Sequence, residues 1–453
     1  MARYCGDYSY SNSPNQNLTP FITDLDKYGR LEIGGCCLSS LAHQYGTPLY
    51  VLDEMTLRAA CRAYRDSLIN FYPGTSLPLY ASKANSCKAV SAIVASEGLG
   101  WDAVSSGEVL TALQSNMPTQ HILLHGNNKS LHELNLALEY GITIVVDNIE
   151  DLQTLAHLIP SNGLPASIVL RVAPGIECHT HEYIRTGRID SKFGLNLNEI
   201  ESILRWLSKC SWAQVTGLHA HIGSQIFELK PHYDLVGVML DIIKMARAMG
   251  HPLVDLNIGG GLGIRYTAYD RPPSIQSWVK SIARAVVLGC KDRCLNLPRL
   301  LCEPGRSVIA TAGVTLYTLG KRKEILGRGT YMSVDGGMSD NPRPITYQSI
   351  YTACLADKSR ISPKESVTLV GKHCESGDIL LKDLDLPLSE PGDILVVFST
   401  GAYNMSMSSN YNRIPRPSTV LVLNGKSDLI QIREQPDDLL RYDTIPPRLS
   451  KLC

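Results

Sequence analysis

The chain lacks an excess of charge of either sign, because its 453 residues include 43 Lys and Arg and 43 Asp and Glu. This balance argues against the basic surfaces that bind nucleic acids or anionic membranes. The chain also lacks an apolar run long enough to span a bilayer, and its polar first 20 residues lack the apolar core of a secretory signal. We therefore expect a cytoplasmic protein with neither a nucleic-acid nor a membrane partner.

The cysteines lack a disulfide or metal-binding pattern. The 13 cysteines are scattered and odd in number, which in a long chain without a secretory signal favours free thiols in a reducing compartment. Cys290 and Cys294 have a spacing compatible with zinc, but no second pair of Cys or His lies nearby in the sequence. We therefore expect no metal site.

A regular alternation of strands and helices fills the middle of the chain. Most strands are continuous apolar runs, as expected for parallel strands buried on both faces. The predicted strands are 77–82, 98–104, 121–125, 142–147, 167–173, 215–221, 253–258 and 298–302. The predicted helices are 87–97, 106–115, 130–139, 149–158, 196–208, 232–249 and 274–288. This α/β pattern predicts a (β/α)8 TIM-type barrel; the alternative is an open doubly wound sheet, because counting strands does not show closure.

Beyond the eighth strand the pattern changes to short strands separated by Gly, Pro, Asn and Asp, which predicts an all-β domain. The predicted strands of this domain are 314–320, 330–334, 367–371, 393–398 and 418–422. Two early strands, 31–33 and 48–52, can join it. We therefore assign residues 53–313 to a barrel domain, and residues 1–52 with 314–453 to a discontinuous β domain.

Residues able to do chemistry gather at the carboxyl ends of the barrel strands. Lys83 follows the first strand, His221 ends the sixth and Glu303 follows the eighth. Three further polar residues at strands two, three and six are Asp102, His125 and His219. Taken singly, these are a solvated lysine, satisfied core histidines and an ion pair of Glu303 with Arg306. Their common position favours one active site, because the carboxyl ends of barrel strands share one face.

A long polar connection joins the fifth and sixth strands. It runs from Gly175 to Phe193 and contains His179, His181 and Arg185. A connection of this length inside a compact domain is usually functional. We therefore expect it to belong to the site.

Three features at the strand ends, namely Lys83, a glycine run and Glu303, fit the parts of pyridoxal phosphate. A desolvated lysine at the end of a rigid strand has a lowered pKa and can hold the aldehyde as a Schiff base. The run Gly259–Gly263 can bring backbone N–H groups to a phosphate, although a tight turn is the alternative. A carboxylate at Glu303 can pair with the ring nitrogen. The combination predicts pyridoxal 5'-phosphate as the cofactor.

Several short motifs jointly resemble a known family. They are Tyr80-Ala81-Ser82-Lys83-Ala84, His219-Ala220-His221-Ile222-Gly223-Ser224, Ser191-Lys192-Phe193-Gly194, Glu303-Pro304-Gly305-Arg306, Asp340-Asn341-Pro342-Arg343-Pro344, Cys374-Glu375-Ser376 and Gly401-Ala402-Tyr403. With them the chain resembles the barrel-type (fold type III) PLP-dependent decarboxylases of basic amino acids, and among these the diaminopimelate decarboxylases. The resemblance implies a C-terminal β domain built as a Greek-key-like barrel, a homodimer with shared active sites, and decarboxylation of meso-2,6-diaminopimelate to L-lysine and CO2.

The resemblance also implies roles for individual residues. Lys83 would carry the cofactor, His221 would stack on its ring and Cys374 would donate a proton, as a largely protonated thiol can. The cofactor contacts would be Lys83, His221, Ser224, Gly260, Gly261, Glu303, Gly305, Arg306 and Tyr403. The substrate contacts would be Arg306, Arg343, Tyr347, Glu375 and Tyr403. Cys374 and Glu375 would act on the Lys83 of the second copy, since a two-fold dimer creates two such sites at once.

The chemistry of the residues agrees with a dicarboxylic diamino acid. Arg306 and Arg343 can bind a distal carboxylate in a bidentate manner, and Glu375 can take a distal ammonium; the structural alternative for Arg343 is a surface charge after a turn. An ornithine or arginine decarboxylase shares the barrel but usually has Asp after the cysteine. An alanine-racemase-like enzyme usually sets Arg against the ring nitrogen, and a non-catalytic regulatory relative loses the lysine or the cysteine, both of which are present here.

Overall fold

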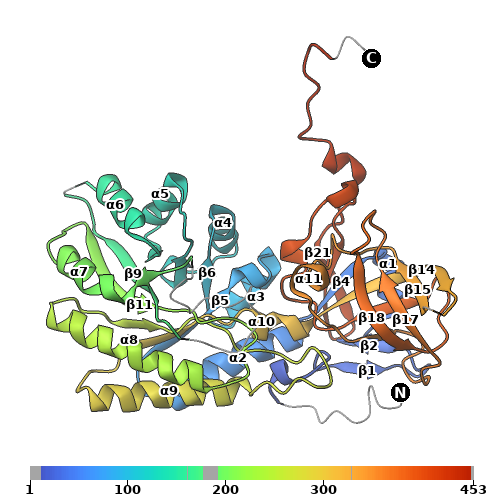
Figure 1. The fold of residues 1–453 in the computed structure, drawn as a ribbon, viewed down its shortest axis with the longest axis horizontal. Coiled ribbons are helices and arrows are strands. Elements are labelled where there is room, and N and C mark those ends of the chain that lie inside the picture. The colour runs from blue at the N-terminus through green and yellow to red at the C-terminus, as the bar shows by residue number, and fades with distance from the viewer. Residues whose placement is uncertain (1–11, 161, 177–191, 328, 450–453) are drawn as a thin grey trace. The chain divides into compact units, whose positions relative to one another are not determined.

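The structure, a computed structural model, describes residues 12–160, 162–176, 192–327 and 329–449 (Figure 1). These residues form two compact units. The barrel unit contains residues 12–21 and Glu54–Ala312, and the sheet unit contains Ile22–Asp53 and residues 313–449. The long polar connection lies mostly outside the described residues, at 177–191, so the expectation for it stays a prediction.

Eight parallel strands form a closed barrel. They are β5 (Ser76–Ala81), β6 (Gly100–Ala103), β7 (Ile122–Leu124), β8 (Thr143–Val146), β9 (Ala166–Ala173), β11 (Ala213–His219), β12 (Asp255–Asn257) and β13 (Arg299–Cys302). Each strand pairs with the next, and β13 pairs with β5, so the ring has no free edge. The predicted TIM-type barrel is therefore confirmed, and the open doubly wound sheet is wrong.

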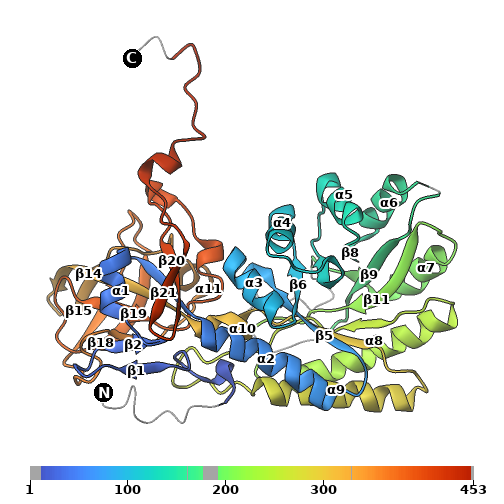
Figure 2. The same cartoon turned by 180° about the vertical axis from the view of Figure 1, so that it is seen from behind.

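The longer helices of the barrel unit alternate with the strands, beginning with α2, which precedes β5. They are α2 (Glu54–Phe71), α3 (Lys88–Ser96), α4 (Ser106–Gln114), α5 (Leu131–Glu139), α6 (Ile149–Leu158), α7 (Leu197–Leu207), α8 (Lys230–Ala248) and α9 (Ile275–Asp292). Side chains of Ser105, Ser130, Asn148 and Ser274 accept N–H groups of the first turn and fix where four of them begin. Helices α2 and α9 lie side by side (Figure 2).

The barrel interior is apolar, which explains the continuous apolar strands. One cluster of buried side chains takes a residue from each of five strands: Leu79, Leu123, Val145, Val169 and Leu301. The opposite faces of the strands are covered by the helices, so residues of both faces are buried. This core leaves the polar groups to the strand ends.

The sheet unit is built around a strand from the beginning of the chain. Its strands are β1 (Thr23–Leu25), β2 (Leu31–Ile33), β3 (Cys36–Cys37), β4 (Leu49–Asp53), β14 (Gly313–Ile325), β15 (Gly329–Val334), β16 (Ala353–Leu355), β17 (Glu365–Val370), β18 (Ile379–Leu386), β19 (Ile394–Val397), β20 (Ser418–Leu423) and β21 (Lys426–Gln431). Strand β4 pairs with β14 on one side and β20 on the other. Figure 1 shows the blue β4 among orange and red strands.

The sheet unit differs from the prediction in two respects. It also contains the helices α1 (Leu38–Tyr45) and α11 (Arg343–Tyr347), so it is not purely β. The first 52 residues were expected in this unit, yet residues 12–21 pack with the barrel unit. There the turn η1 (Pro14–Gln16) places Asn15, which is fully buried, beside the loop after β12. Among the described helices, none is long and apolar enough to cross a membrane.

Candidate active site

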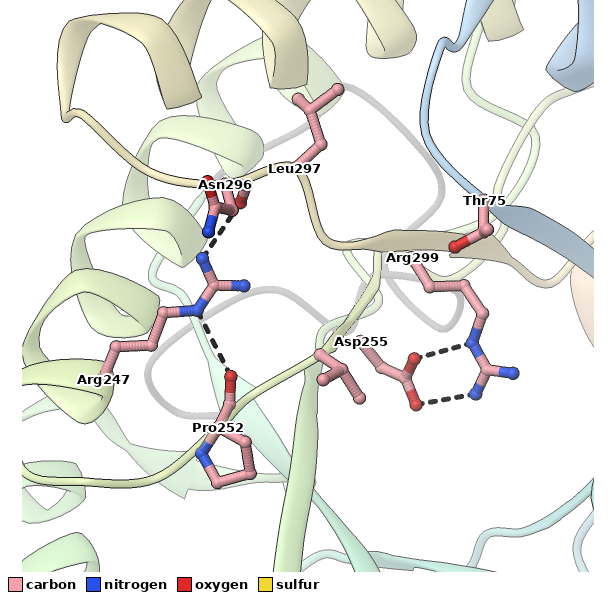
Figure 3. Close-up of a pocket in the computed structure, with 8 residues that line it drawn as sticks. Thr75, Arg247, Pro252, Asp255, Asn296, Leu297 and Arg299 are labelled. Atoms are coloured by element: carbon pink, nitrogen blue, oxygen red, sulfur yellow. Dashed lines mark hydrogen bonds and ion pairs between the residues drawn. The ribbon is translucent and has the colours of Figure 1, made fainter.

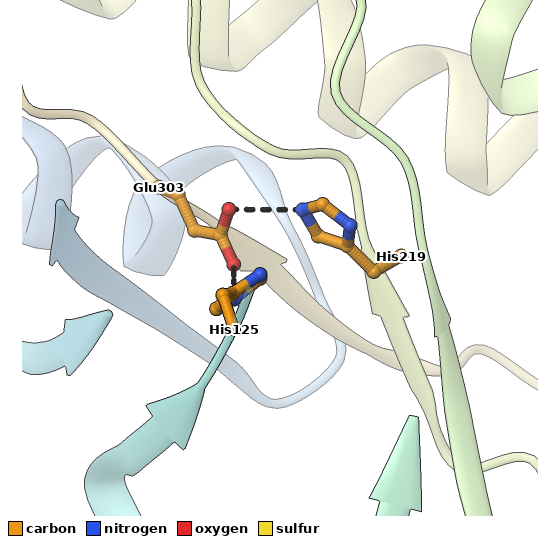
Figure 4. A group of neighbouring side chains, drawn as sticks. All are labelled: His125, His219 and Glu303. Carbon is orange, nitrogen blue, oxygen red and sulfur yellow. Dashed lines mark hydrogen bonds and ion pairs between the residues drawn. The ribbon is translucent and has the colours of Figure 1, made fainter. Parts of the chain in front are cut away.

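The polar residues at the carboxyl ends of the barrel strands converge on Glu303, which directly follows β13. Its buried carboxylate accepts hydrogen bonds from His219 Nε2 at 2.9 Å and Asn257 Nδ2 at 2.6 Å. The Nε2 atom of His125 lies 2.9 Å from Oε1 of the same carboxylate. Figure 4 shows both imidazoles pointing at the carboxylate from different strands. The barrel mouth therefore holds one carboxylate surrounded by N–H donors.

The charges of this cluster follow from burial and from its neighbours. Burial alone would raise the pKa of Glu303, but His125 and His219 hold that pKa well below its usual value. Burial opposes a charge on His125, yet Asp102 and Glu303 raise its pKa. Burial lowers the pKa of His219 to about 4. Glu303 is thus a carboxylate at neutral pH, stabilised by the two histidines beside it.

The same cluster offers metal-binding atoms, since one atom each of His125, His219 and Glu303 lie within 4.8 Å of one another. The two imidazole Nε2 atoms, however, lie at hydrogen-bond distance from the carboxylate oxygens. Metal coordination would require both nitrogens to give up their protons and turn from Glu303. The arrangement therefore fits a carboxylate that binds an organic molecule better than it fits a set of metal ligands.

Lys83 lies on the short turn η2 (Ser82–Ala84) directly after β5. Burial raises the pKa of Asp102 to about 6, and the positive charge of Lys83 partly opposes this rise. The same charge adds to burial in lowering the pKa of His221, so the three groups share one region. The side chain of Lys83 is exposed, whereas the sequence predicted a desolvated amine. The difference arises because the lysine follows the strand on a turn instead of lying within it.

His221 follows β11 and is half-buried. Its Nδ1 accepts the backbone N–H of Gly260 at 3.1 Å, so the proton of the neutral ring is on Nε2. Burial, and next the charge of Lys83, hold the pKa of His221 well below its usual value. The ring is therefore neutral and fixed in orientation.

The glycine run after β12 has no room for side chains. A Cβ at Gly260 would lie 2.2 Å from the carbonyl oxygen of Glu303, and one at Gly261 would lie 2.6 Å from that of Gly223. Gly261 also has φ of +118°, which side-chain-bearing residues rarely adopt. Among the described residues, no protein group accepts the backbone N–H of Gly261 or that of Leu262. These two donors are available to an anion.

Gly305 and Arg306 follow Glu303 and start the short helix α10 (Arg306–Ile309). A Cβ at Gly305 would lie 3.0 Å from the Cβ of Ala81, so the glycine allows β13 and β5 to end close together. The buried Arg306 donates to Ser224 Oγ at 2.8 Å and to Tyr266 Oη at 2.7 Å. Arg306 is therefore not paired with Glu303 as the structural alternative supposed, and it positions Ser224.

The other predicted substrate residues lie in the sheet unit. The guanidinium of Arg343, buried on α11, lies 5.0 Å from the ring centre of Tyr347 and 5.2 Å from that of Tyr403. Tyr403 has an unusual φ of +65°. Arg343 is thus held between two aromatic rings, in contrast to the surface charge of the structural alternative.

Cys374 and Glu375 lie on the loop between β17 and β18, where both are exposed. Glu375 accepts a hydrogen bond from Tyr411 Oη at 2.5 Å, and the ring of Tyr411 stacks on His373. The backbone N–H of Cys374 donates to Asn412 at 3.2 Å. The segment around Tyr411 therefore holds this loop in place. In the isolated chain, the loop exposes the Cys374 thiol and the Glu375 carboxylate to solvent.

The sequence reasoning did not select three residues that the structure adds to these sites. Asn257 bonds Glu303, Tyr266 bonds Arg306, and Tyr411 bonds Glu375. A signal existed only for Asn257, because it is a polar residue at the carboxyl end of a barrel strand. Tyr266 and Tyr411 lie in irregular segments, where spacing gives no indication of a partner.

A pocket lies at the opposite, amino-terminal end of the barrel strands, lined by Thr75, Arg247, Pro252, Val254, Asp255, Asn296, Leu297 and Arg299. Figure 3 shows that its charged groups bind one another and the backbone. Arg299 forms two bonds to Asp255, and Arg247 donates to the carbonyls of Pro252, Leu253 and Asn296. These groups stabilise the barrel, as is usual at this face.

Comparison with known proteins gives the same picture of the molecule. Residues 54–310 match the model of the pyridoxal binding domain of pyridoxal-dependent decarboxylases. A diaminopimelate decarboxylase of Synechocystis is 52% identical over 447 residues, which cover 97% of this chain and 95% of the relative. One of Bacillus subtilis is 42% identical, covering 92% and 96%. The crystal structure of diaminopimelate decarboxylase from M. jannaschii in complex with L-lysine has a TM-score of 0.89 at 32% identity, covering 96% of this chain and 100% of that one.

Proposed function

The chain belongs to the pyridoxal-dependent decarboxylases and, within them, to the diaminopimelate decarboxylases, and from this premise we propose that its catalytic centre is the strand-end cluster around Lys83 and Glu303. The enzyme uses pyridoxal 5'-phosphate. It converts meso-2,6-diaminopimelate to L-lysine and CO2, the last step of lysine biosynthesis.

The residues of the barrel mouth fit the parts of this cofactor. The exposed amine of Lys83 is accessible to the aldehyde, and the ionised Glu303 offers a carboxylate to the ring nitrogen. The N–H groups of Gly261 and Leu262 suit the phosphate, in a run where Gly260 leaves no space for a side chain. Arg306 orients Ser224 beside them. Bound pyridoxal phosphate supplies an electron sink for the electron pair left by the departing carboxylate.

Side chains of the protein hold and donate the protons that the reaction needs. Glu303 keeps a proton on the ring nitrogen, because His125 and His219 favour its charged form. His221, with its Nδ1 occupied by Gly260, presents one fixed face to the ring. The thiol of Cys374 donates the proton that replaces the carboxylate at the α-carbon. One C–C bond is thus exchanged for one C–H bond.

Substrate selection is assigned to the far end of the diamino acid. The buried Arg343, between Tyr347 and Tyr403, binds the distal carboxylate, together with Arg306. Glu375, held by Tyr411, takes the distal ammonium. Ornithine has no distal carboxylate and would leave Arg343 without its partner, which disfavours the alternative ornithine or arginine decarboxylase.

We further propose a cytoplasmic homodimer with shared sites. The ten cysteines among the described residues are all free thiols, which suits a reducing compartment. Cys374 and Glu375 belong to the sheet unit, whereas Lys83 and Glu303 belong to the barrel unit. In the proposed dimer, Cys374 and Glu375 of one copy serve the Lys83 of the other.

The observation that carries the proposal is the buried, ionised Glu303 at the end of β13, next to the strand end that bears Lys83. The purified protein incubated with pyridoxal phosphate should be yellow and should release lysine and CO2 from meso-diaminopimelate. Borohydride should fix the cofactor to the peptide containing Lys83, and Lys83→Ala should abolish the label. A label on Lys88 or Lys129 would contradict the assignment, and turnover of ornithine in place of diaminopimelate would contradict the substrate.

A further inference from the structure

The glycine run after β12 has nearly all of its backbone groups occupied by the protein itself. The N–H of Gly259 bonds Asn257, and that of Gly260 bonds His221. Two carbonyls are bonded by side chains from outside the site: His232 Nε2 lies 3.0 Å from the oxygen of Gly260, and Asn15 Nδ2 lies 3.0 Å from that of Gly263. Of these two side chains, which are remote in sequence, His232 thus fixes the peptide group that carries the N–H of Gly261, and Asn15 fixes the peptide group that follows Gly263.

His232 comes from the first turn of α8 and is almost fully buried, at 1% exposure. Its other ring nitrogen, Nδ1, accepts the indole N–H of Trp278 on α9 at 3.4 Å, and the two rings meet edge to face at 5.1 Å. Because Nδ1 accepts, Nε2 must carry the proton and donate it to Gly260. Burial also lowers the pKa of His232 to about 4, so the ring stays neutral at physiological pH. The ring therefore has one tautomer and one orientation.

Asn15 comes from the turn η1, which lies before the segment with the family motifs. Its side chain is fully buried and also donates to Pro273, while Ser13 Oγ donates to its Oδ1. Its own carbonyl accepts the N–H of Arg265 at 2.9 Å. Asn15 therefore binds the end of the glycine run through its side chain, and Arg265, two residues further, through its backbone.

We infer that His232 and Asn15 are positioning residues for the cofactor phosphate, so that Asn15 links the beginning of the chain to the cofactor site. Each acts through a carbonyl of the run and touches no ligand itself. His232 holds the peptide group of the Gly261 N–H directly, and the backbone N–H of Ile226 holds that of Leu262 through the Gly261 carbonyl. With Asn15 holding the end of the run, both N–H groups stay turned toward one anion. The inference rests on the proposed placement of the phosphate at this run.

The test measures cofactor affinity separately from stability. Apo enzyme is titrated with pyridoxal phosphate and with pyridoxal, which lacks the phosphate, and the ratio of the two dissociation constants reports the phosphate contribution. His232→Leu and Asn15→Ala should each weaken pyridoxal phosphate binding roughly tenfold, the scale of one lost buried hydrogen bond, and should reduce the ratio similarly. His232→Gln, which restores a donor, should recover part of the loss.

Two matched controls separate positioning from general stability. His251→Leu removes another buried histidine that bonds a backbone carbonyl, that of Leu204 at 2.8 Å, before β12 at the opposite end of the strand. Gln16→Ala removes a bond from the same turn to Pro272 instead of to the run. Both should lower the melting temperature of the apo enzyme and leave the ratio within about twofold of wild type.

Each outcome decides the question. If His232→Leu and Asn15→Ala lower stability but keep the wild-type ratio, or if the controls reduce the ratio equally, the two residues are structural and the inference is wrong. Should His232→Leu fail to fold, the ratio for Asn15→Ala and His232→Gln decides alone. A wild-type enzyme that bound pyridoxal as tightly as pyridoxal phosphate would instead refute the proposed phosphate site, and with it the inference.

Discussion

A single buried histidine makes the stability of this chain sensitive to mild acid. The pKa of His232 is lowered by burial from 6.5 to about 4 in the folded protein, whereas the unfolded chain titrates near 6.5. Between these values the unfolded state binds more protons, so the free energy of unfolding falls as pH falls. The stabilisation linked to His232 is full above pH 6.5 and is lost toward pH 4.

The first prediction compares His232→Gln with wild type. Because glutamine does not titrate, the variant should lose about 2 kcal/mol less of its free energy of unfolding between pH 7 and pH 5. Urea denaturation of the apo enzymes at the two pH values measures this difference. Equal losses in the two proteins would show that His232 is protonated, or exposed, in the folded state.

The second prediction concerns Tyr411, whose hydroxyl bonds Glu375. Without this bond the carboxylate is free to turn away from the substrate ammonium, so Tyr411→Phe should raise KM for diaminopimelate roughly three- to tenfold with little change in kcat, a modest effect because the pair is solvent-exposed. Steady-state kinetics measure both constants. The matched control is Tyr331→Phe, since Tyr331 is 38% and Tyr411 40% exposed. An unchanged KM would mean that Glu375 does not bind the ammonium group of the substrate.

At the residue level, the sequence predicted which side chains stand at strand ends, because strand position alone decides it. It did not predict that Lys83 is exposed, since burial depends on the turn η2 that follows the strand. It also did not predict that Asn15 reaches Gly263, 248 residues away. Contacts of that separation depend on the assembled fold and leave no local pattern.

At the level of elements, the short helix α11 begins with Arg343. The buried guanidinium lies over the rings of Tyr347 and Tyr403 and donates to Ser349 Oγ at 3.4 Å. In the proposed site, the distal carboxylate of the substrate would bind this same guanidinium.

The third prediction follows from this placement. Arg343→Ala should lower kcat/KM for diaminopimelate at least about 100-fold, because the distal carboxylate loses its charged partner. Binding of pyridoxal phosphate, followed by its absorbance, should remain. Arg360→Ala, which removes an exposed arginine of the same unit, is the control. Normal turnover and KM in Arg343→Ala would refute the distal-carboxylate assignment.

The elements of the barrel were more predictable than those of the sheet unit. Strands such as β9 are buried on both faces and form continuous apolar runs that the sequence shows directly. Strand β18 alternates irregularly between buried and exposed residues and pairs with β17 through register shifts, so no simple period marks it. The short strands β16 and β21, and helix α1, were also not predicted.

At the scale of the whole molecule, the two units carry different parts of the proposed site. The fourth prediction is that Lys83→Ala and Cys374→Ala are each nearly inactive alone but regain activity when mixed and allowed to exchange subunits. A heterodimer would hold one site with both residues intact, so up to about a quarter of wild-type activity should return, from half of the dimers with one working site each. Assay of the mixture, with mass spectrometry of the exchanged dimers, measures this. Background activity despite formed heterodimers would show that each site is built within one chain.

The position of β4 between β14 and β20 has a consequence for the order of events at the ribosome. Strand β4 is synthesised first, but residues 54–312 separate it from its neighbour β14. At about 5–20 residues per second, this interval lasts roughly 13 to 50 s. During this time both edges of β4 lack their final partners and are open to pairing with other chains. The order of synthesis therefore favours early folding of the barrel. The sheet can form only after the last third of the chain has been synthesised.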